Sequence, residues 1–289
     1  MVVASGAHSL RLKRVRLSLT PPVIMGILNV TPDSFSDGGE FLSVSRALEH
    51  ARGMLEAGAA IIDVGGESTR PGASPVPVEE ELARTVPVVR ALVEELGAVV
   101  SIDTSKPEVM RAAVEAGAEL INDVNALRAP GALEAAAESG AAVCLMHMQG
   151  TPRDMQHDPR YRDVVAEVRT FLQERASACL AAGIPAESIV LDPGFGFGKR
   201  LEHNLALFRH LPDLAALGYP LLVGVSRKSM VGALTGQDDP RHRVYGSVAL
   251  ALLAVQRGAS ILRVHDVAAT REVLACWEAI EGQEGGARA

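Results

Sequence analysis

Short apolar runs recur along most of the chain, each followed by a polar or glycine-rich loop and then by an amphipathic stretch. The runs are rich in valine and isoleucine, which is typical of strands buried on both faces of a parallel sheet. They are VIMGILNV (23–30), IIDVGG (61–66), VVSIDT (99–104), LINDV (120–124), AVCLM (142–146), IVLDPG (189–194), LLVGVS (221–226) and ILRVHD (261–266). The alternation predicts a series of strand–helix units.

The stretches between these runs have the apolar spacing of amphipathic helices. Examples are residues 45–58, 78–96, 107–117 and 164–183. Several such stretches end in glycine, the residue that most often follows the last turn of a helix. These glycines are Gly58, Gly117, Gly140, Gly183, Gly218 and Gly258. We expect a helix to end at each of them.

Eight strand–helix units in about 260 residues match a (β/α)8 TIM barrel in number and size. A doubly wound open sheet is the structural alternative. No unit carries a Rossmann fingerprint after its first strand, and polar residues stand at the end of nearly every strand instead of at one switch point. Both observations favour an α/β fold with one TIM-barrel domain.

The two ends of the chain depart from the repeated pattern. Residues 10–19 mostly alternate apolar and charged, which predicts a short strand or hairpin. A basic arm is the alternative, and the acidic total charge disfavours it. We therefore expect an N-terminal extension over residues 1–20, the barrel over 21–281 and a flexible tail over 282–289.

The formal net charge of −7 disfavours a general binder of nucleic acid or of anionic membranes. It does not exclude a local pocket for an anion. No stretch resembles a membrane span. The basic N-terminus is followed by an apolar run that Pro21 and Pro22 interrupt, and no small-residue cleavage pattern follows. The expected location is the cytoplasm.

Cys144, Cys179 and Cys276 lie far apart and have no C-x-x-C spacing. This argues against a disulfide framework and against a zinc site. We expect all three to be buried thiols in a reducing compartment.

Polar residues stand at or just after the ends of all eight predicted strands. They are Asn29; Asp63 with Glu67, Ser68, Thr69 and Arg70; Asp103; Asn122 and Asp123; Met146 with His147; Asp192; Ser226, Arg227, Lys228 and Ser229; and Arg263, His265 and Asp266. In a TIM barrel these strand ends converge on one face, where active sites are built. One such residue can simply cap a loop or a helix, but eight strand ends together indicate an active site.

Two kinds of chemistry are present in this set. Arg263, His265 and Asn29 can hold a multiply charged anion, with the arginine as a bidentate donor. The other kind comes from acceptors and amide donors at Asp103, Asn122 and Asp192. These suit a planar heterocycle with N–H donors and a carbonyl. Because buried carboxylates need donors, a guanidine-like edge of the ligand or Lys228 would supply them.

Two long loops follow the first two strands. They are NVTPDSFSDGGEF (29–41) and GGESTRPGASPVPV (65–78). Loops of this composition on the active face often act as lids. A plain surface loop is the alternative, and Arg70 beside Pro71 favours the lid, because a charged residue there can reach a substrate.

The segment LDPGFGFGK (191–199) has the glycines and lysine of a nucleotide loop, but it fits neither nucleotide motif. A P-loop requires Gly where Pro193 stands and Ser or Thr where Arg200 stands, and the glycine spacing is not G-x-G-x-x-G. The segment is better read as a strand that ends on Asp192, followed by a turn that presents two phenylalanines. We expect one phenylalanine to line a pocket, the other to pack in the core, and Lys199 to face solvent.

Seven motifs together resemble the dihydropteroate synthase family. They are GILNVTPDSFSDGG, DVGGESTRPGA, SIDTSK, INDVNA, LDPGFGFGK, GVSRKS and RVHD. The resemblance runs in order from about residue 23 to 280, and its two loop motifs are long and highly specific. It implies an enzyme that joins 6-hydroxymethyl-7,8-dihydropterin pyrophosphate to p-aminobenzoate. Mg²⁺ as cofactor and a homodimer are also implied.

The resemblance assigns roles to individual residues. The implied pterin contacts are Asp103, Asn122, Val124, Met146, Asp192 and Lys228. The implied pyrophosphate contacts are Asn29, Thr69, Arg263 and His265, with Asn29 also a metal contact. The implied p-aminobenzoate contacts are Thr69, Arg70, Pro71, Phe197, Lys228 and Ser229. Asp33 and Phe35 belong to the first lid, and Asp103, Lys228, Arg263 and His265 form the implied catalytic set.

The implied mechanism needs no side-chain nucleophile. Mg²⁺, Arg263 and His265 stabilise the departing pyrophosphate, a cation forms on the pterin methylene near Asp103, and the arylamine attacks it. Closed lids exclude water, which would otherwise capture the cation. The sequence shows no Ser-His-Asp order and no activated cysteine.

Two alternatives share the barrel and the pterin-holding acids. A methyltransferase of the methyltetrahydrofolate:corrinoid type is not expected to carry STRPG, SRKS and RVHD together, and this chain has all three. A catalytically inactive pterin-binding paralogue has no need of pyrophosphate contacts.

Overall fold

The computed structural model describes residues 8–30, 40–68, 72–151 and 153–281. Two loop predictions concern residues outside these ranges. Asp33 and Phe35 of the first lid and Thr69, Arg70 and Pro71 of the second are among them, as is the predicted tail.

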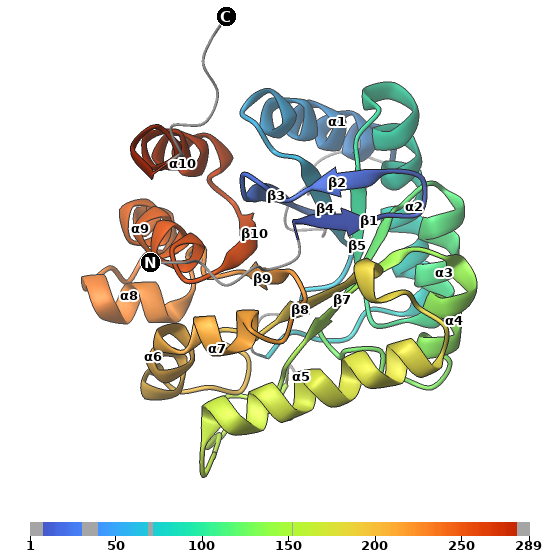
Figure 1. Ribbon diagram of the computed structural model, residues 1–289. Helices are drawn as coiled ribbons and strands as arrows, with labels where there is room; N and C mark the ends of the chain where they lie inside the picture. Colours follow the sequence, from blue (N-terminus) through green and yellow to red (C-terminus); the bar gives the residue numbers. More distant parts are fainter. Residues whose placement is uncertain (1–7, 31–39, 69–71, 152, 282–289) are drawn as a thin grey trace, which may run out of the picture.

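Eight parallel strands close into a barrel in which neighbours along the chain pair with one another and the last strand pairs with the first (Figure 1). The strands are β3 (Val23–Asn29), β4 (Ile61–Gly65), β5 (Val100–Asp103), β6 (Leu120–Asp123), β7 (Ala142–Met146), β8 (Ile189–Asp192), β9 (Leu221–Val223) and β10 (Ala259–Val264). Each apolar run in the sequence forms one of them. The predicted TIM barrel is therefore confirmed.

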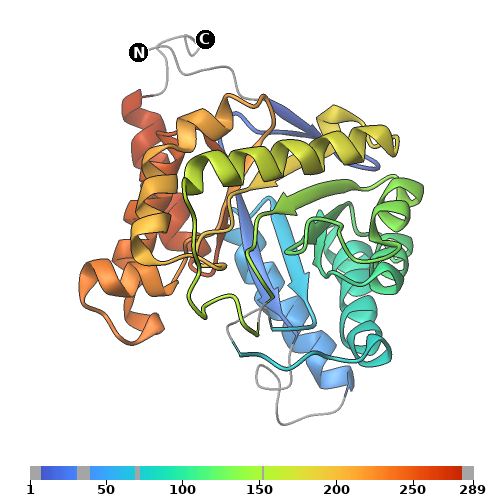
Figure 2. The same cartoon turned by 90° about the horizontal axis from the view of Figure 1, so that it is seen from below.

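Helices surround the barrel on its outer side (Figures 1 and 2). They are α1 (Glu40–Glu56), α2 (Val78–Leu96), α3 (Pro107–Glu115), α4 (Ala132–Ser139), α5 (Val164–Ala181), α6 (Leu201–Arg209), α7 (Leu211–Ala215), α8 (Ser229–Thr235), α9 (Val244–Val255) and α10 (Val267–Glu281), with 3-10 turns η2 (Ala186–Ser188) and η3 (Pro240–His242). The six glycines expected to end helices all follow a helix closely and all have positive φ, from 69° to 114°. Glycine adopts this conformation without a steric penalty, so these helix ends are confirmed.

The N-terminal segment forms the predicted hairpin, with β1 (Ser9–Arg11) antiparallel to β2 (Arg16–Ser18). Leu10, Leu12 and Leu19 are buried in one cluster with apolar residues that line the barrel interior near the strand starts. The hairpin thus covers the amino end of the barrel, across which it lies in Figure 1. Arg14 on the hairpin donates to the buried carboxylate of Glu119 just before β6.

The prediction that the cysteines are buried is correct for two residues and wrong for the third. Cys144 and Cys179 are buried, whereas Cys276 is exposed on α10. The buried residues of α10 are Val267, Thr270 and Leu274, and a side chain two positions beyond Leu274 on a helix points to a very different side. No helix in the described ranges combines the length and the apolar character needed to cross a membrane.

Candidate active site

Arg263 on β10 bonds to acidic side chains of two other strands at the carboxyl end of the barrel. Its Nε lies 2.6 Å from Oδ2 of Asp63 on β4, and its Nη2 lies 2.7 Å from Oδ2 of Asp103 on β5. Asn122 on β6 donates from Nδ2 to the same Asp63 oxygen at 3.1 Å. Because β3 separates β10 from β4 in the barrel, the arginine side chain reaches past β3 to hold both acids. Residues from β4, β5, β6 and β10 therefore share one polar cluster.

The ionisation of this cluster is set by burial and by the paired charges. Burial opposes the charge of Arg263, but the attraction of Asp63 and Asp103 outweighs it and raises the pKa of the guanidinium. Burial raises the pKa of Asp103 to about 7 against the attraction of Arg263. Asp103 is thus a carboxylate whose charge is sensitive to pH near neutrality.

A second charged pair lies at the ends of β8 and β9. Asp192 is buried, and its Oδ1 accepts a hydrogen bond from the Gly194 amide at 2.7 Å. Lys228 donates from Nζ to the Phe195 carbonyl oxygen at 2.6 Å. Burial lowers the pKa of Lys228 to about 8, although Asp192 attracts its positive charge. Burial raises the pKa of Asp192, and Lys228 opposes this.

Apolar side chains border the same pair. Met146, at the end of β7, packs in one cluster with Val124 and Phe197. The Phe197 ring centroid lies 4.6 Å from Lys228 Nζ, which is a cation–π distance. Phe195 is fully buried, so the expectation that one of the two phenylalanines packs in the core is confirmed.

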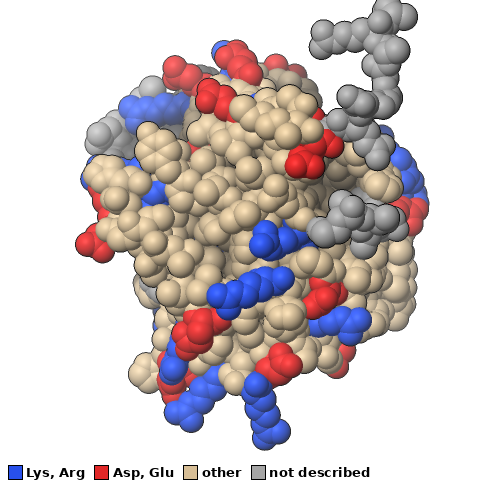
Figure 3. Space-filling model, turned by 60° about the vertical axis from the view of Figure 1, so that its left-hand side comes forward, with Lys and Arg blue, Asp and Glu red and all other residues tan. Residues whose placement is uncertain are grey.

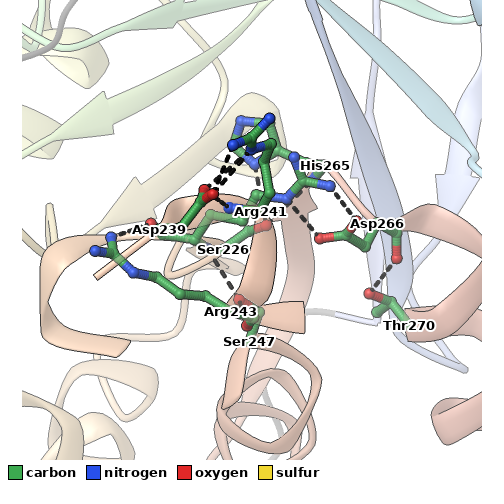
Figure 4. Close-up of polar contacts among 9 residues, drawn as sticks. Ser226, Asp239, Arg241, Arg243, Ser247, His265, Asp266 and Thr270 are labelled. Carbon is green, nitrogen blue, oxygen red and sulfur yellow. Dashed lines mark hydrogen bonds and ion pairs between the residues drawn. The ribbon is translucent and has the colours of Figure 1, made fainter. Parts of the chain in front are cut away.

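The loops after β9 and β10 are tied to each other by two consecutive contacts (Figure 4). Ser226 Oγ lies 3.0 Å from His265 Nδ1 and accepts from the His265 amide at 3.2 Å. The guanidinium of Arg227 then pairs with the Asp266 carboxylate, with Nε 2.9 Å from Oδ2. Lys228, which follows these two residues, is therefore placed relative to His265.

Arg227 has a φ of 57°, in the left-handed region that side-chain-bearing residues rarely adopt. Its amide donates to Ser247 Oγ on α9, and its carbonyl oxygen accepts from Arg243, both at 2.9 Å. Such a conformation costs on the order of 1–3 kcal/mol and persists where surrounding contacts enforce it. We infer that these contacts turn the chain so that Lys228 enters the barrel mouth.

Comparisons with known proteins identify the family of this chain. A family model described as "Pterin binding enzyme" matches residues 25–265. The dihydropteroate synthase of Escherichia coli (strain K12) is 55% identical over 263 residues, which span 91% of this chain and 93% of that protein. The chain belongs to the dihydropteroate synthase family. It is accordingly an enzyme, a transferase.

Solved structures of dihydropteroate synthases have the same fold. The Xanthomonas albilineans enzyme with 4-aminobenzoic acid aligns with a TM-score of 0.90 and 54% identity, covering 96% of this chain and 99% of that one. The same enzyme in complex with 7,8-dihydropteroate aligns with a TM-score of 0.86 and 50% identity, covering 95% and 99%.

Asn29 is the residue for which the family resemblance implies a metal contact. A Cβ atom placed on Gly65 would lie 3.6 Å from Asn29 Oδ1 and 3.6 Å from Asp103 Cβ, so the amide lies close to the Asp103 side chain. In the described ranges no group of three His, Cys, Asp or Glu residues could hold a metal. A single amide oxygen beside a carboxylate fits Mg²⁺ bound mainly through substrate phosphates, because Mg²⁺ commonly keeps several waters and takes few protein ligands.

The prediction that Lys199 faces solvent is wrong. Its side chain is 3% exposed, and its Nζ lies among acceptors from two loops. Gly194, Gly196 and Gly198 all have positive φ, from 62° to 80°, and they curl the turn so that the lysine folds back beneath it. The alternating glycines were the available signal of this tight turn, but they do not reveal which side of it the lysine occupies.

Two further residues of the site received no role from the sequence. Asp63 is completely buried and pairs with Arg263. The sequence signal for a role was its position as a charged residue inside the apolar run IIDVGG. His147 is buried beside Lys199, and nothing in its local sequence distinguishes it from a loop residue.

Proposed function

We propose that this chain condenses 6-hydroxymethyl-7,8-dihydropterin pyrophosphate with p-aminobenzoate to give 7,8-dihydropteroate and pyrophosphate. The observation that carries the proposal is the arrangement at the barrel mouth. Buried acids and an amide suit a pterin ring, an arginine bonds to two of the acids, and a lysine charge acts on a third. The related structures with 4-aminobenzoic acid and with 7,8-dihydropteroate support these substrates.

The pterin ring would lie between Asp103, Asn122 and Asp192. The two carboxylates accept hydrogen bonds from ring nitrogens and the exocyclic amine, and the amide serves the ring carbonyl. Lys228 provides positive charge beside Asp192, and Met146 and Val124 form an apolar wall. A planar ring gains both specificity and apolar contact from such a pocket.

Asn29, Arg263 and His265 would bind the pyrophosphate. Asp63 and Asp103 hold the Arg263 guanidinium in place, so little reorganisation is needed when charge develops on the leaving group. Mg²⁺ supplies further positive charge to that group when bound, with Asn29 as its protein ligand. Thr69 belongs to the same set by the family resemblance and lies outside the described residues.

The p-aminobenzoate site would lie at the rim, where Phe197 and Lys228 form a cation–π pair and Ser229 begins α8. Arg70 and Pro71 complete this site by resemblance. The aromatic face of Phe197 can pack against the substrate ring, and the positive charges suit its carboxylate.

In the proposed reaction the protein stabilises charge and positions both substrates without forming a covalent bond. Arg263 and His265 bind the pyrophosphate as it departs, and the Asp103 carboxylate stabilises the cation left on the pterin methylene. The arylamine, held at the rim, then attacks from close range. Lid closure over the mouth would exclude water, and Asp33 and Phe35 belong to that lid by resemblance.

The direct test is an assay with both substrates and Mg²⁺, monitored for dihydropteroate and pyrophosphate. Formation of both products in equal amounts is the expected result. Pterin binding without turnover would favour an inactive paralogue, and methyl transfer to a corrinoid would favour the methyltransferase. We also expect the enzyme to be cytoplasmic, which stays a prediction.

The pH dependence of kcat/KM for the pterin substrate should be a narrow bell. Asp103, with its pKa raised to about 7, gains a proton and loses its charge below that pH. Lys228, with its pKa lowered to about 8, loses its proton above that pH. The ionisation state with both charges is therefore most populated between about 7 and 8. Steady-state rates at saturating p-aminobenzoate from pH 5.5 to about 9.5 measure this, because kcat/KM reports groups of the free enzyme. A flat profile would contradict these charge roles.

We propose that the homodimer forms through the side of the molecule made by α8, α9 and α10. Leu234, Tyr245, Leu253 and Ile280 are 47%, 87%, 38% and 80% exposed there, and large uncharged areas cover this side in Figure 3. Large apolar side chains exposed on one side of a molecule are typical of a subunit interface.

Leu253→Glu is expected to dissociate the dimer, because it places a charge within the buried interface. Light scattering should give twice 30.4 kDa for the wild type and about 30.4 kDa for the variant. Leu180→Glu, at a 44% exposed position on α5, is the matched control and should remain a dimer. A dimer that persists in the first variant would place the interface elsewhere.

A further inference from the structure

Lys199 is a buried lysine to which the proposed reaction gives no role. Its Nζ lies 2.9 Å from His147 Nδ1, 2.9 Å from the Gly194 carbonyl oxygen and 3.0 Å from that of Phe197. The His147 carbonyl oxygen lies 3.2 Å away. All four acceptors are neutral groups. The ammonium thus joins the segment after β7 to the turn after β8.

This position is unfavourable for the charge of a lysine. Burial lowers the pKa of Lys199 well below its usual value, with Asp192 opposing. Burial, followed by repulsion from Lys199, lowers the pKa of His147 to about 2, so the imidazole is neutral and can accept. A buried cation without a contacting carboxylate costs free energy that an apolar side chain would not. The lysine is therefore better explained by the backbone segments that its hydrogen bonds hold in position than by a contribution to stability.

Its hydrogen bonds belong to a consecutive set on the turn 194–197. All four carbonyl oxygens of this turn accept from side chains: Lys199 donates to the first and the fourth, Lys228 to the second and Gln156 to the third. Two of these donors are lysines, and one of them is the lysine of the proposed substrate site. The turn is thus held from both sides, by Lys199 beneath and by Lys228 at the mouth.

The turn also has little room to move toward the segment after β7. A Cβ on Gly194 would lie 1.9 Å from the His147 carbonyl oxygen, and one on Gly198 would lie 2.5 Å from that of Gln149. The backbone of the turn therefore lies directly against the segment after β7. Lys199 bridges these two backbones at the point where they meet.

The Lys199 bridge fixes the position of Phe197. Its carbonyl oxygen is one of the acceptors of Lys199, and its ring lies 4.6 Å from Lys228 Nζ. Loss of the Lys199 ammonium would release both ends of the turn, Gly194 and Phe197, while the backbone of β8 and Asp192 stays in the barrel.

We propose that Lys199 is a positioning residue that fixes the turn 194–197, so that Phe197 is correctly placed to bind the arylamine substrate. This rests on the proposed function, because the arylamine site is part of it. The lysine acts through Phe197 and does not itself contact substrate.

The test is Lys199→Met, which keeps the length of the side chain and removes its donors. The KM for p-aminobenzoate should rise about tenfold, whereas the KM for the pterin pyrophosphate and kcat should change less than twofold. Lys13→Met makes the same substitution at an exposed position between β1 and β2 and should leave all three constants unchanged. Equal increases in both KM values, or none, would overturn the proposal.

A double-mutant cycle with Phe197→Ala separates positioning from general damage. If Lys199 acts through Phe197, the p-aminobenzoate KM of the double variant should match that of Phe197→Ala alone. Multiplied effects would show that the two residues act independently and would contradict the proposal. If Lys199→Met does not fold, Lys199→Gln retains a donor and is tested in the same cycle with the same two outcomes. A wild type that forms no dihydropteroate would refute the proposed function itself, whereas an active wild type with a uniform loss in the variant refutes only the role of Lys199.

Discussion

Arg263→Met is expected to reduce both stability and activity strongly. The arginine is the shared partner of Asp63, which is completely buried, and of Asp103, which is 8% exposed. Its removal leaves two neighbouring buried carboxylates without a compensating charge, at a cost of about 3–5 kcal/mol in the free energy of unfolding. The variant also lacks a preorganised donor for the leaving pyrophosphate, which should lower kcat/KM by about 10²–10³.

Urea denaturation at pH 7.5 and steady-state kinetics measure the two effects separately. Arg263→Met combined with Asp63→Asn should recover part of the lost stability, because one of the unpaired charges is gone, yet it should recover no activity. Arg241→Met is the matched control, since Arg241 is 81% exposed and its ion pair with Asp239 contributes little. If Arg263→Met unfolded at the same urea concentration as the wild type, the carboxylates would not depend on the arginine.

The fold was accessible from the sequence because its signals are local. A run such as AVCLM fits a strand buried on both faces. Gly140, just before it, ends a helix in the left-handed conformation, which glycine adopts without a steric penalty. Repetition of such signals predicted the barrel. The barrel in turn predicted that Asp103 and Arg263, 160 positions apart, lie at one mouth.

The pairing within the mouth was not accessible in this way. The guanidinium of Arg263 bonds to carboxylates on β4 and β5, although its backbone pairs with β3. This reach depends on the stagger of the strands and on side-chain length. The sequence placed Arg263 with the anion, but it did not show that Asp63 would hold it. Arg227 likewise depends on contacts from α9 and from the β10 loop that no local pattern encodes.

Lys199 and Cys276 show the opposite kinds of error. Lysine is rarely buried, so exposure was the natural expectation for Lys199. The side chain is buried instead, because three glycines with positive φ fold the turn back over it. Cysteine is commonly buried, and Cys276 lies outside the apolar face of α10. Composition preferences fail at such places because the position of a side chain around a turn or a helix decides its exposure.

Lys228→Met is expected to lower kcat/KM for the pterin substrate by about 10²–10³ at pH 7.5, the usual effect of losing one preorganised donor in an active site. The variant loses the charge beside Asp192, the donor to the Phe195 carbonyl and the cation over the Phe197 ring. Lys228→Arg keeps a positive charge and should retain more activity than the methionine variant.

The pH profiles of the two variants decide whether the charge of Lys228 is what matters. The wild type should lose activity above about pH 8, where Lys228 loses its proton. Lys228→Arg should lack this decline, because a guanidinium stays protonated throughout the accessible range. In Lys228→Met, Asp192 loses the charge that opposes the upward shift of its pKa, so it holds its proton to higher pH than in the wild type. Its residual activity should also lack the decline above about pH 8, because the titrating ammonium is gone. Parallel profiles for all three proteins would show that Lys228 serves the site by shape and contact, and that its charge is not required.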